Sequence, residues 1–174
     1  MIELQRGDVF LTRSDKLFGK LIRIRGRMRS PDGEANYNHA GIIAGEDGAS
    51  FESRRRIDDY SIYDFTGQQV LIARTTAQEF ATLAAIRRLT GRYHGKVYPW
   101  WRIVLHALTP FLARKLHASY IPVCSELVAE FLYLINCRHG ECWGTTPDVL
   151  EDELKNYRQY TIIFEGILPA REPQ

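Results

Sequence analysis

One cysteine opens the most strongly patterned helix that this sequence predicts, within residues 121–132. Apolar side chains follow it at the spacing of one buried helix face, at Leu127, Val128, Phe131, Leu132, Leu134 and Ile135. Pro122 and Val123 favour an extended approach, so Cys124 and Ser125 fall in the first helical turn. A thiol there lies near free backbone N–H groups and the positive end of the helix dipole, which favours the nucleophilic thiolate. From this pattern alone, a buried and inert Cys124 is the alternative.

Length and composition predict a single globular domain. The 174 residues are 45% hydrophobic and 25% charged, which suits one core, and we expect a domain over residues 1–168 with a flexible tail over residues 169–174. The sequence contains no apolar run long enough to cross a bilayer, and residues 1–8 do not resemble a secretory signal. Three cysteines leave one unpaired in any disulfide scheme. We therefore expect reduced thiols and a cytoplasmic protein, which would reach an outside substrate through lysis or a secretion apparatus.

Positive charge gathers in residues 13–29, although the net charge of the chain is only +2. The pattern predicts a basic amphipathic helix that ends near Gly26. Its arginines, among them Arg23, Arg25 and Arg27, form either a contact surface for anionic groups such as phospholipid headgroups or a solvated helix face. This segment is the only basis for nucleic-acid binding, so we expect no obligate nucleic-acid partner.

A β-hairpin is predicted around residues 38–53, with a turn at residues 46–48. Because side chains alternate along a strand, His39 and Gly41 share one face. An even-numbered loop centred between residues 46 and 47 places Gly41 opposite Glu52, because 41 + 52 equals 45 + 48. Glu52 then lies diagonally beside His39 on the same face, whereas an odd-numbered loop breaks this pairing.

Further elements complete an α+β chain. We expect strands at residues 9–12, 69–74 and 160–164, helices at residues 76–89 and 145–154, and irregular structure at residues 57–67. In the first helix, Thr76 is the expected cap, Phe80 and Leu83 belong to the apolar face, and Gly91 ends the helix. The apolar residues 100–116 form either a core helix pair or a lid over a site for an apolar chain.

Thiol chemistry requires a base for the cysteine, a group that orients the base, and donors for the oxyanion. Of the five histidines, His39 opens a glycine-containing strand and has Glu52 as a candidate orienting group, whereas His94 is a reserve base. A rival cluster at residues 137–142 contains two cysteines and one histidine. It lacks the second ligand pair of a structural zinc site, so we expect no metal and no cofactor.

The order of the motifs adds a family resemblance. Gly7-Asp8-Val9 is followed by Asn38-His39-Ala40-Gly41, by Phe51-Glu52-Ser53, by Gly95-Lys96-Val97-Tyr98, by Val123-Cys124-Ser125-Glu126 and by Thr146-Pro147-Asp148. This order resembles the circularly permuted NlpC-type papain-like hydrolases of the YaeF/YiiX group, which are related to the lecithin:retinol acyltransferase-like proteins. In that group the histidine strand precedes the cysteine helix, as His39 precedes Cys124 here. The resemblance covers roughly residues 7–154.

The resemblance implies a permuted papain-like fold, with a small antiparallel sheet or half-barrel packed against the helix that begins at the cysteine. Cys124 is then the nucleophile, His39 the general base and Glu52 the third member of the triad. Tyr98, Asn38 and Ser125 are the implied substrate-binding residues. The expected activity is that of a cysteine hydrolase with an acyl-enzyme intermediate, most simply an amidase or peptidase. The alternatives are a lipid ester or thioester hydrolase or acyltransferase, and a non-catalytic module that binds anionic surfaces.

Overall fold

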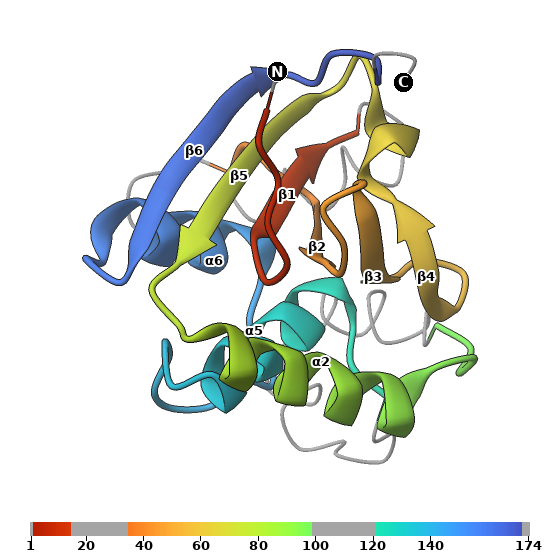
Figure 1. The fold of residues 1–174 in the computed structure, drawn as a ribbon, viewed down its shortest axis with the longest axis vertical. Helices are drawn as coiled ribbons and strands as arrows, with labels where there is room; N and C mark the ends of the chain where they lie inside the picture. Colours follow the sequence, from red (N-terminus) through yellow and green to blue (C-terminus); the bar gives the residue numbers. More distant parts are fainter. Residues whose placement is uncertain (1, 15–34, 99–120, 172–174) are drawn as a thin grey trace.

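The computed structural model describes residues 2–14, 35–98 and 121–171. These residues form a six-stranded antiparallel sheet with the order β4-β3-β2-β1-β5-β6 (Figure 1). The strands are β1 (Val9–Arg13), β2 (His39–Ile43), β3 (Ala49–Ser53), β4 (Ile57–Ser61), β5 (Gln69–Thr75) and β6 (Tyr160–Ile167). The helices are α2 (Glu79–Tyr93), α5 (Cys124–Leu134), α6 (Pro147–Asn156) and the short 3-10 helix η1 (Ile62–Phe65). The predicted α+β class with an antiparallel sheet is confirmed.

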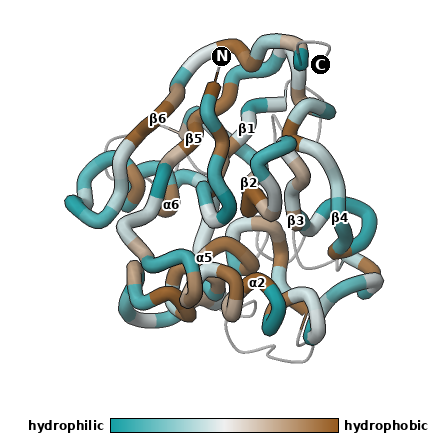
Figure 2. The backbone as a smooth tube through the Cα atoms, viewed as in Figure 1, coloured by the Kyte–Doolittle hydropathy of each residue, from teal (hydrophilic) through white to brown (hydrophobic). Residues whose placement is uncertain are grey.

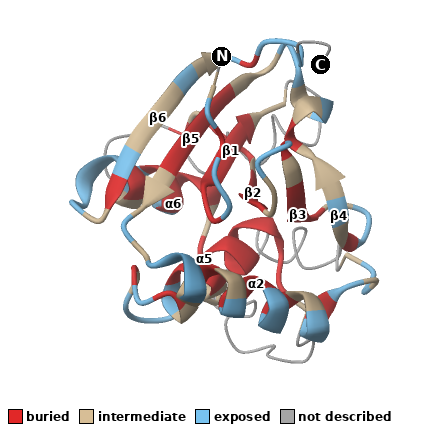
Figure 3. Ribbon diagram, viewed as in Figure 1, coloured by how far each residue is buried: buried red, intermediate tan, exposed pale blue. Residues whose placement is uncertain are grey.

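The sheet separates two apolar cores, because successive side chains of a strand point to opposite faces. Val9 and Leu11 of β1 belong to the core that contains α2, α5 and α6, whereas Phe10 between them belongs to the other core. The second core is completed by η1 and by residues near both ends of the chain, including Leu4 and Leu168. Figure 2 shows the apolar stretch of α5 and Figure 3 shows its burial beneath the sheet.

The predicted helix at the cysteine is confirmed as α5, which begins at Cys124. The apolar face identified from the sequence is buried at Leu127, Val128, Phe131, Leu132 and Ile135, and Leu134 is partly buried against the same core. Burying one whole side of an eleven-residue helix supplies the stabilisation that such a short helix lacks in isolation. The position of Cys124 is therefore set by the packing of α5.

The hairpin has the predicted register, with Gly41 opposite Glu52. Gly41 is required by close approach, because a Cβ atom at this position would lie 2.7 Å from Cγ of Glu52 and would also meet the ring of Phe10. Glu52 thus lies on the same sheet face as His39, diagonally across the strand pair.

Predictions for two segments, residues 76–91 and residues 57–67, were wrong. The helix expected from Thr76 begins at Glu79 with no side-chain cap, because β5 continues to Thr75 and pairs there with Tyr160. It also runs through Gly91 to Tyr93, and Phe80 is 83% exposed because Thr82, Ala85, Ile86 and Leu89 form the buried face instead. Residues 57–67 are not irregular: they form β4 and η1, which the buried side chains of Ile57 and Ile62 anchor.

Other predicted elements appear with shifted ends. The strands predicted at residues 69–74 and 160–164 correspond to β5 and β6, and the helix predicted at residues 145–154 corresponds to α6. Each lies within a few residues of the expected range. At the C-terminus Leu168 is buried and exchanges backbone hydrogen bonds with residues 67 and 68, whereas residues 169–171 are exposed.

The predicted basic helix after Ser14, including Arg23, Arg25 and Arg27, and the apolar residues 100–116 lie outside the described residues. Among the described helices, none has the length and apolar character needed to cross a membrane.

Candidate active site

The candidate nucleophile, Cys124, is the first residue of α5 and is 7% exposed. The first turn of the helix is held by the side chain of Glu126, whose Oε2 accepts the N–H of Val123 at 3.0 Å and whose Oε1 accepts the N–H of Gly144 at 2.8 Å. A neighbouring contact joins this turn to the sheet, because Oγ of Ser53 donates to the carbonyl of Pro122 at 3.2 Å. The approach to the cysteine is therefore tied to strand β3 and to the loop after α5.

The candidate base, His39, is the first residue of β2 and keeps 15% of its side chain exposed. Its Nε2 lies 2.7 Å from Oε2 of Glu52. Its ring packs at 5.4 Å, between centroids, against the ring of Phe65. Because Nε2 faces Glu52, Nδ1 is the nitrogen left for the hydrogen bond between His39 and the Cys124 thiol.

The cysteine and the histidine change each other's protonation. Burial disfavours charge on both groups, but hydrogen bonding and charge attraction outweigh it. The hydrogen bonds that protonated His39 donates to Cys124 and Glu52 raise its pKa to about 9. His39, together with the backbone N–H groups of Ala40 and Ser125, lowers the pKa of Cys124 from its ordinary value of 9.0. Both shifts favour a thiolate beside an imidazolium over the neutral pair.

The backbone of β2 contributes to this environment at Ala40. The paired register between β2 and β3 runs from Ile43 opposite Ser50 to Gly41 opposite Glu52. Ala40 lies one residue beyond this register, and its N–H points to the Cys124 sulfur instead. The end of the β2–β3 pairing thus supplies a backbone donor that could not be identified from the amino-acid sequence.

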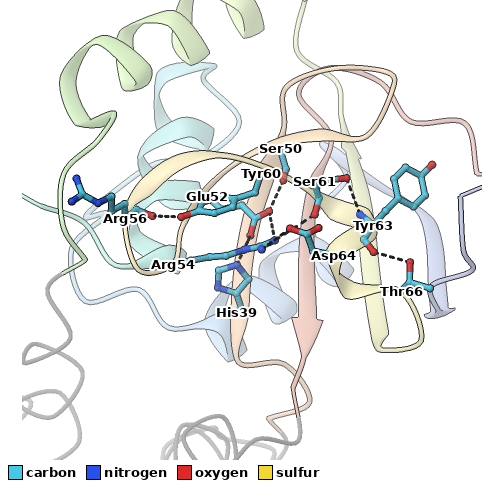
Figure 4. Close-up of polar contacts among 10 residues, drawn as sticks. All are labelled: His39, Ser50, Glu52, Arg54, Arg56, Tyr60, Ser61, Tyr63, Asp64 and Thr66. Carbon is cyan, nitrogen blue, oxygen red and sulfur yellow. Dashed lines mark hydrogen bonds and ion pairs between the residues drawn. The ribbon is translucent and has the colours of Figure 1, made fainter.

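The orienting group, Glu52, is completely buried and has three side-chain partners besides its place in β3 (Figure 4). Oε2 contacts His39 and accepts Nε of Arg54 at 2.7 Å. Oε1 accepts Nη2 of Arg54 at 3.0 Å and the hydroxyl of Ser50. Burial alone would raise the pKa of this carboxyl, but His39 and Arg54 together hold it below the ordinary value.

Arg54 is the first of three consecutive arginines at residues 54–56, and the run by itself assigns none of them a role. In the structure its guanidinium lies 4.4 Å from the ring centres of both Tyr60 and Phe65 (Figure 4 shows Tyr60). Its Nη1 donates to Oδ2 of Asp64 at 2.8 Å. Arg54 and Ser50 each lie two residues from Glu52, so strand alternation was the signal that could have found both.

The three predicted substrate-binding residues have different surroundings. The buried side chain of Asn38 exchanges hydrogen bonds with the backbone of Ser14, at 3.1 Å and 2.8 Å. The buried hydroxyl of Ser125 donates to the carbonyl of Thr145 at 2.7 Å. Both side chains thus stabilise the loops beside the site. Tyr98 is partly exposed, and its N–H bonds the carbonyl of Arg55 at 3.0 Å, in the segment that follows β3.

The other cysteines and the reserve base, His94, lie outside the contact between Cys124, His39 and Glu52. Burial raises the pKa of both Cys137 and Cys142, which is the opposite of the shift at Cys124. His94, the reserve base, pairs with Oδ1 of Asp58 at 2.9 Å. With Asp59, these two residues are the one set in the described chain whose side chains could gather around a metal ion.

Comparison with known proteins finds a likeness of fold but no match of sequence family. No family model matches the sequence, and no curated protein matches it significantly. Among solved structures, the chain is similar to the crystal structure of the metalloprotein YiiX from Escherichia coli O157:H7. The TM-score is 0.62 at 15% sequence identity, and the match covers 96% of this chain and 99% of that chain. The likeness is one of fold, and it agrees with the YiiX group to which the order of motifs pointed.

Proposed function

We propose that the protein is a cysteine hydrolase that uses Cys124 as nucleophile, His39 as acid–base group and Glu52 as orienting carboxylate. The observation that carries this proposal is the continuous contact from the Cys124 thiol to His39 and from His39 to Glu52, at the start of a helix. A thiol at a helix start, an imidazole bonded to it and a third polar group on the imidazole are the three parts of thiol acyl-transfer chemistry. The proposal also includes the permuted papain-like relationship, which the YiiX-like fold supports at the level of architecture.

The proposed reaction has two steps. The Cys124 thiolate attacks a carbonyl carbon, and the negative charge on the carbonyl oxygen is stabilised by the N–H of Cys124 at the start of α5. The His39 imidazolium then gives its proton to the leaving amine as the carbon–nitrogen bond breaks, which leaves a thioester on Cys124. In the second step His39 takes a proton from water, the resulting hydroxide attacks the thioester, and the acid leaves as the thiolate forms again.

An amide or peptide bond is the substrate class that this geometry favours. An amine is a poor leaving group unless it is protonated, and an imidazolium with a pKa of about 9 remains charged and available at neutral pH. Thioester exchange does not need such an acid to the same degree. The features that suggested lipid acyl transfer, residues 100–116 and the arginines after Ser14, lie outside the described residues. Lipid acyl transfer and a purely binding role therefore remain outcomes of the tests below.

A metal plays no part in the proposed reaction, although the similar YiiX structure is described as a metalloprotein. The described residues that could gather around an ion are Asp58, Asp59 and His94. They offer three ligands, whereas structural zinc takes four, and their side chains are between 37% and 67% exposed. They belong to β4 and the end of α2, whereas the proposed nucleophile and base belong to α5 and β2.

The first experiment is the rate of iodoacetamide alkylation of Cys124 against pH, measured by peptide mapping in the wild type and in His39→Ala. We expect Cys124 to react well below pH 9 and to lose this reactivity in His39→Ala, because the imidazolium stabilises the thiolate. Cys137 and Cys142 are internal references, because burial raises their pKa values. If Cys124 reacts no faster than these two cysteines, and His39→Ala changes nothing, the proposed enzyme is wrong.

A second assay separates the substrate classes. An amidase releases a new amine from a peptide mixture without lipid, and Cys124→Ala abolishes this release. A lipid enzyme instead forms an acyl adduct on Cys124 with liposomes, visible by intact mass. A binding module shows neither result and retains its surface binding in Cys124→Ala.

A further inference from the structure

The proposed triad is the inner part of a longer row of charged side chains. From the surface inwards, the row is Asp64 of η1, Arg54 after β3, Glu52 of β3, His39 of β2 and Cys124 of α5 (Figure 4 shows the first four). Neighbouring charges along this row are opposite in sign when the thiolate and imidazolium are formed. Asp64 is 51% exposed, Arg54 is 23% exposed and Glu52 has no exposed area, so the row runs from solvent into the core.

The charge balance depends on Arg54. Without Asp64, which solvent screens, the four inner groups carry two positive and two negative charges, and their sum is zero. Removal of the guanidinium would leave one uncompensated negative charge among buried groups, which is costly. Among the described residues, the uncharged groups that face this row are the Ser50 hydroxyl on Glu52, the carbonyl of Ser61 and the ring of Tyr60 on Arg54, the ring of Phe65 on both Arg54 and His39, and the N–H groups of Ala40 and Ser125 on Cys124. Among the residues that the structure describes, the positive groups in contact with Glu52 are His39 and Arg54.

The guanidinium also controls the direction of Glu52. Two parallel N–H donors of Arg54 bind the two carboxylate oxygens at 2.7 Å and 3.0 Å. Such a fork fixes the plane of a carboxylate, which a single charge does not do. The fork is itself fixed, because the guanidinium lies against two aromatic rings at 4.4 Å and bonds Asp64 at 2.8 Å.

We propose that Arg54 is a positioning residue of the active site, which holds Glu52 towards His39 and completes the charge balance that allows Cys124 to exist as a thiolate. This inference rests on the proposed hydrolase function. It assigns a role to a residue outside the triad, two positions after Glu52 on the same strand face.

The test is the pH dependence of Cys124 alkylation in Arg54→Met. In the wild type the alkylation rate rises with pH as the thiolate forms, and we call this rise the acidic limb of the profile. Loss of the positive charge should move this limb to higher pH by roughly one unit, which is about a tenfold loss of alkylation rate at a pH below the limb. Arg54→Lys keeps the charge and should restore most of the limb. The double variant Glu52→Gln with Arg54→Met removes one charge of each sign, so its acidic limb should return towards that of the wild type.

Arg74→Met is the matched control. Arg74 also forks onto a buried carboxylate, with Nε and Nη2 each 3.0 Å from Asp8, and it is 28% exposed. Asp8 lies four positions before Thr12, the β1 residue that pairs with His39, so this second pair is at the other end of the strand. Arg74→Met should reduce stability without moving the alkylation profile.

The outcomes separate the two proposals. If the wild type shows a His39-dependent reactive Cys124 but Arg54→Met leaves the acidic limb unchanged, the role of Arg54 is wrong and the hydrolase proposal stands. If the wild-type thiol is unreactive, the hydrolase proposal itself fails. If Arg54→Met does not fold, the double variant is compared with Glu52→Gln alone. An acidic limb that lies about one pH unit higher in the double variant than in Glu52→Gln supports the role of Arg54. Identical alkylation profiles of these two variants overturn it.

Discussion

Glu52→Gln is the most informative single change, because it removes a charge and keeps the shape of the side chain. Glu52 has no exposed area, and its carboxylate bonds His39 at 2.7 Å and Arg54 at 2.7 Å and 3.0 Å. Removing one member of a buried ion pair leaves its partner uncompensated and typically costs about 3–5 kcal/mol. We expect a loss of this size in the free energy of unfolding, measured by urea denaturation at pH 7.

Asp64→Asn is the matched control for this measurement. It removes a carboxylate that bonds the same Arg54 at 2.8 Å, but Asp64 is 51% exposed. Exposed pairs contribute at most about 1 kcal/mol, so this variant should be close to the wild type. A Glu52→Gln protein within about 1 kcal/mol of the wild type would refute the charged state of the row. In that event, neither an imidazolium at His39 nor a thiolate at Cys124 would be supported by this carboxylate.

Two further predictions concern the pair itself and the glycine beside it. The raised pKa of His39 gives a contribution to stability that is fully present below pH 6.5 and is lost as pH rises to about 9. The lowered pKa of Cys124 gives a contribution that is fully present above pH 9.0 and is lost as pH falls through the lowered value, so the two pH dependences have opposite signs. The difference in unfolding free energy between the wild type and the double variant His39→Ala with Cys124→Ala should therefore depend less on pH between 6.5 and about 9 than either shift alone would make it, whereas a fall across this range with the slope of one bound proton would contradict the ion pair. Gly41→Ala should cost about 1–3 kcal/mol, because its Cβ would lie 2.7 Å from Cγ of Glu52, and it should also slow Cys124 alkylation; unchanged stability and reactivity would show that this close approach is not needed.

The parts of the site that could be predicted are those that depend on local periodicity. The apolar spacing after Pro122 gave the buried face of α5, and an even-numbered hairpin loop gave the pairing of Gly41 with Glu52. Both follow from one repeating geometry, of the helix or of the strand, with no knowledge of the partner that packs against it.

The parts that could not be predicted depend on competition between elements. Thr76 has the character of a helix cap, but the pairing of Thr75 with Tyr160 extends β5 and delays the start of α2. The sequence also predicts Phe80 on the buried face of α2, whereas it is exposed, because burial is decided by contacts with α5 and β4, which the sequence of the helix does not contain. Arg54 is an intermediate case, since alternation places it on the face of Glu52, but a run of three arginines does not show which one forms the fork.

Strand β3 explains how a cysteine and a histidine 85 positions apart (124 − 39) can be held in register. Its residue Glu52 points to one face and bonds His39, and its next residue, Ser53, points to the other face and bonds the carbonyl of Pro122, two residues before Cys124. One strand therefore controls both the base and the approach to the nucleophile. A slip of β3 by one residue would exchange these two faces and separate both contacts at once. The closely packed Gly41 and the buried fork from Arg54 each hold Glu52 in the register that avoids this slip.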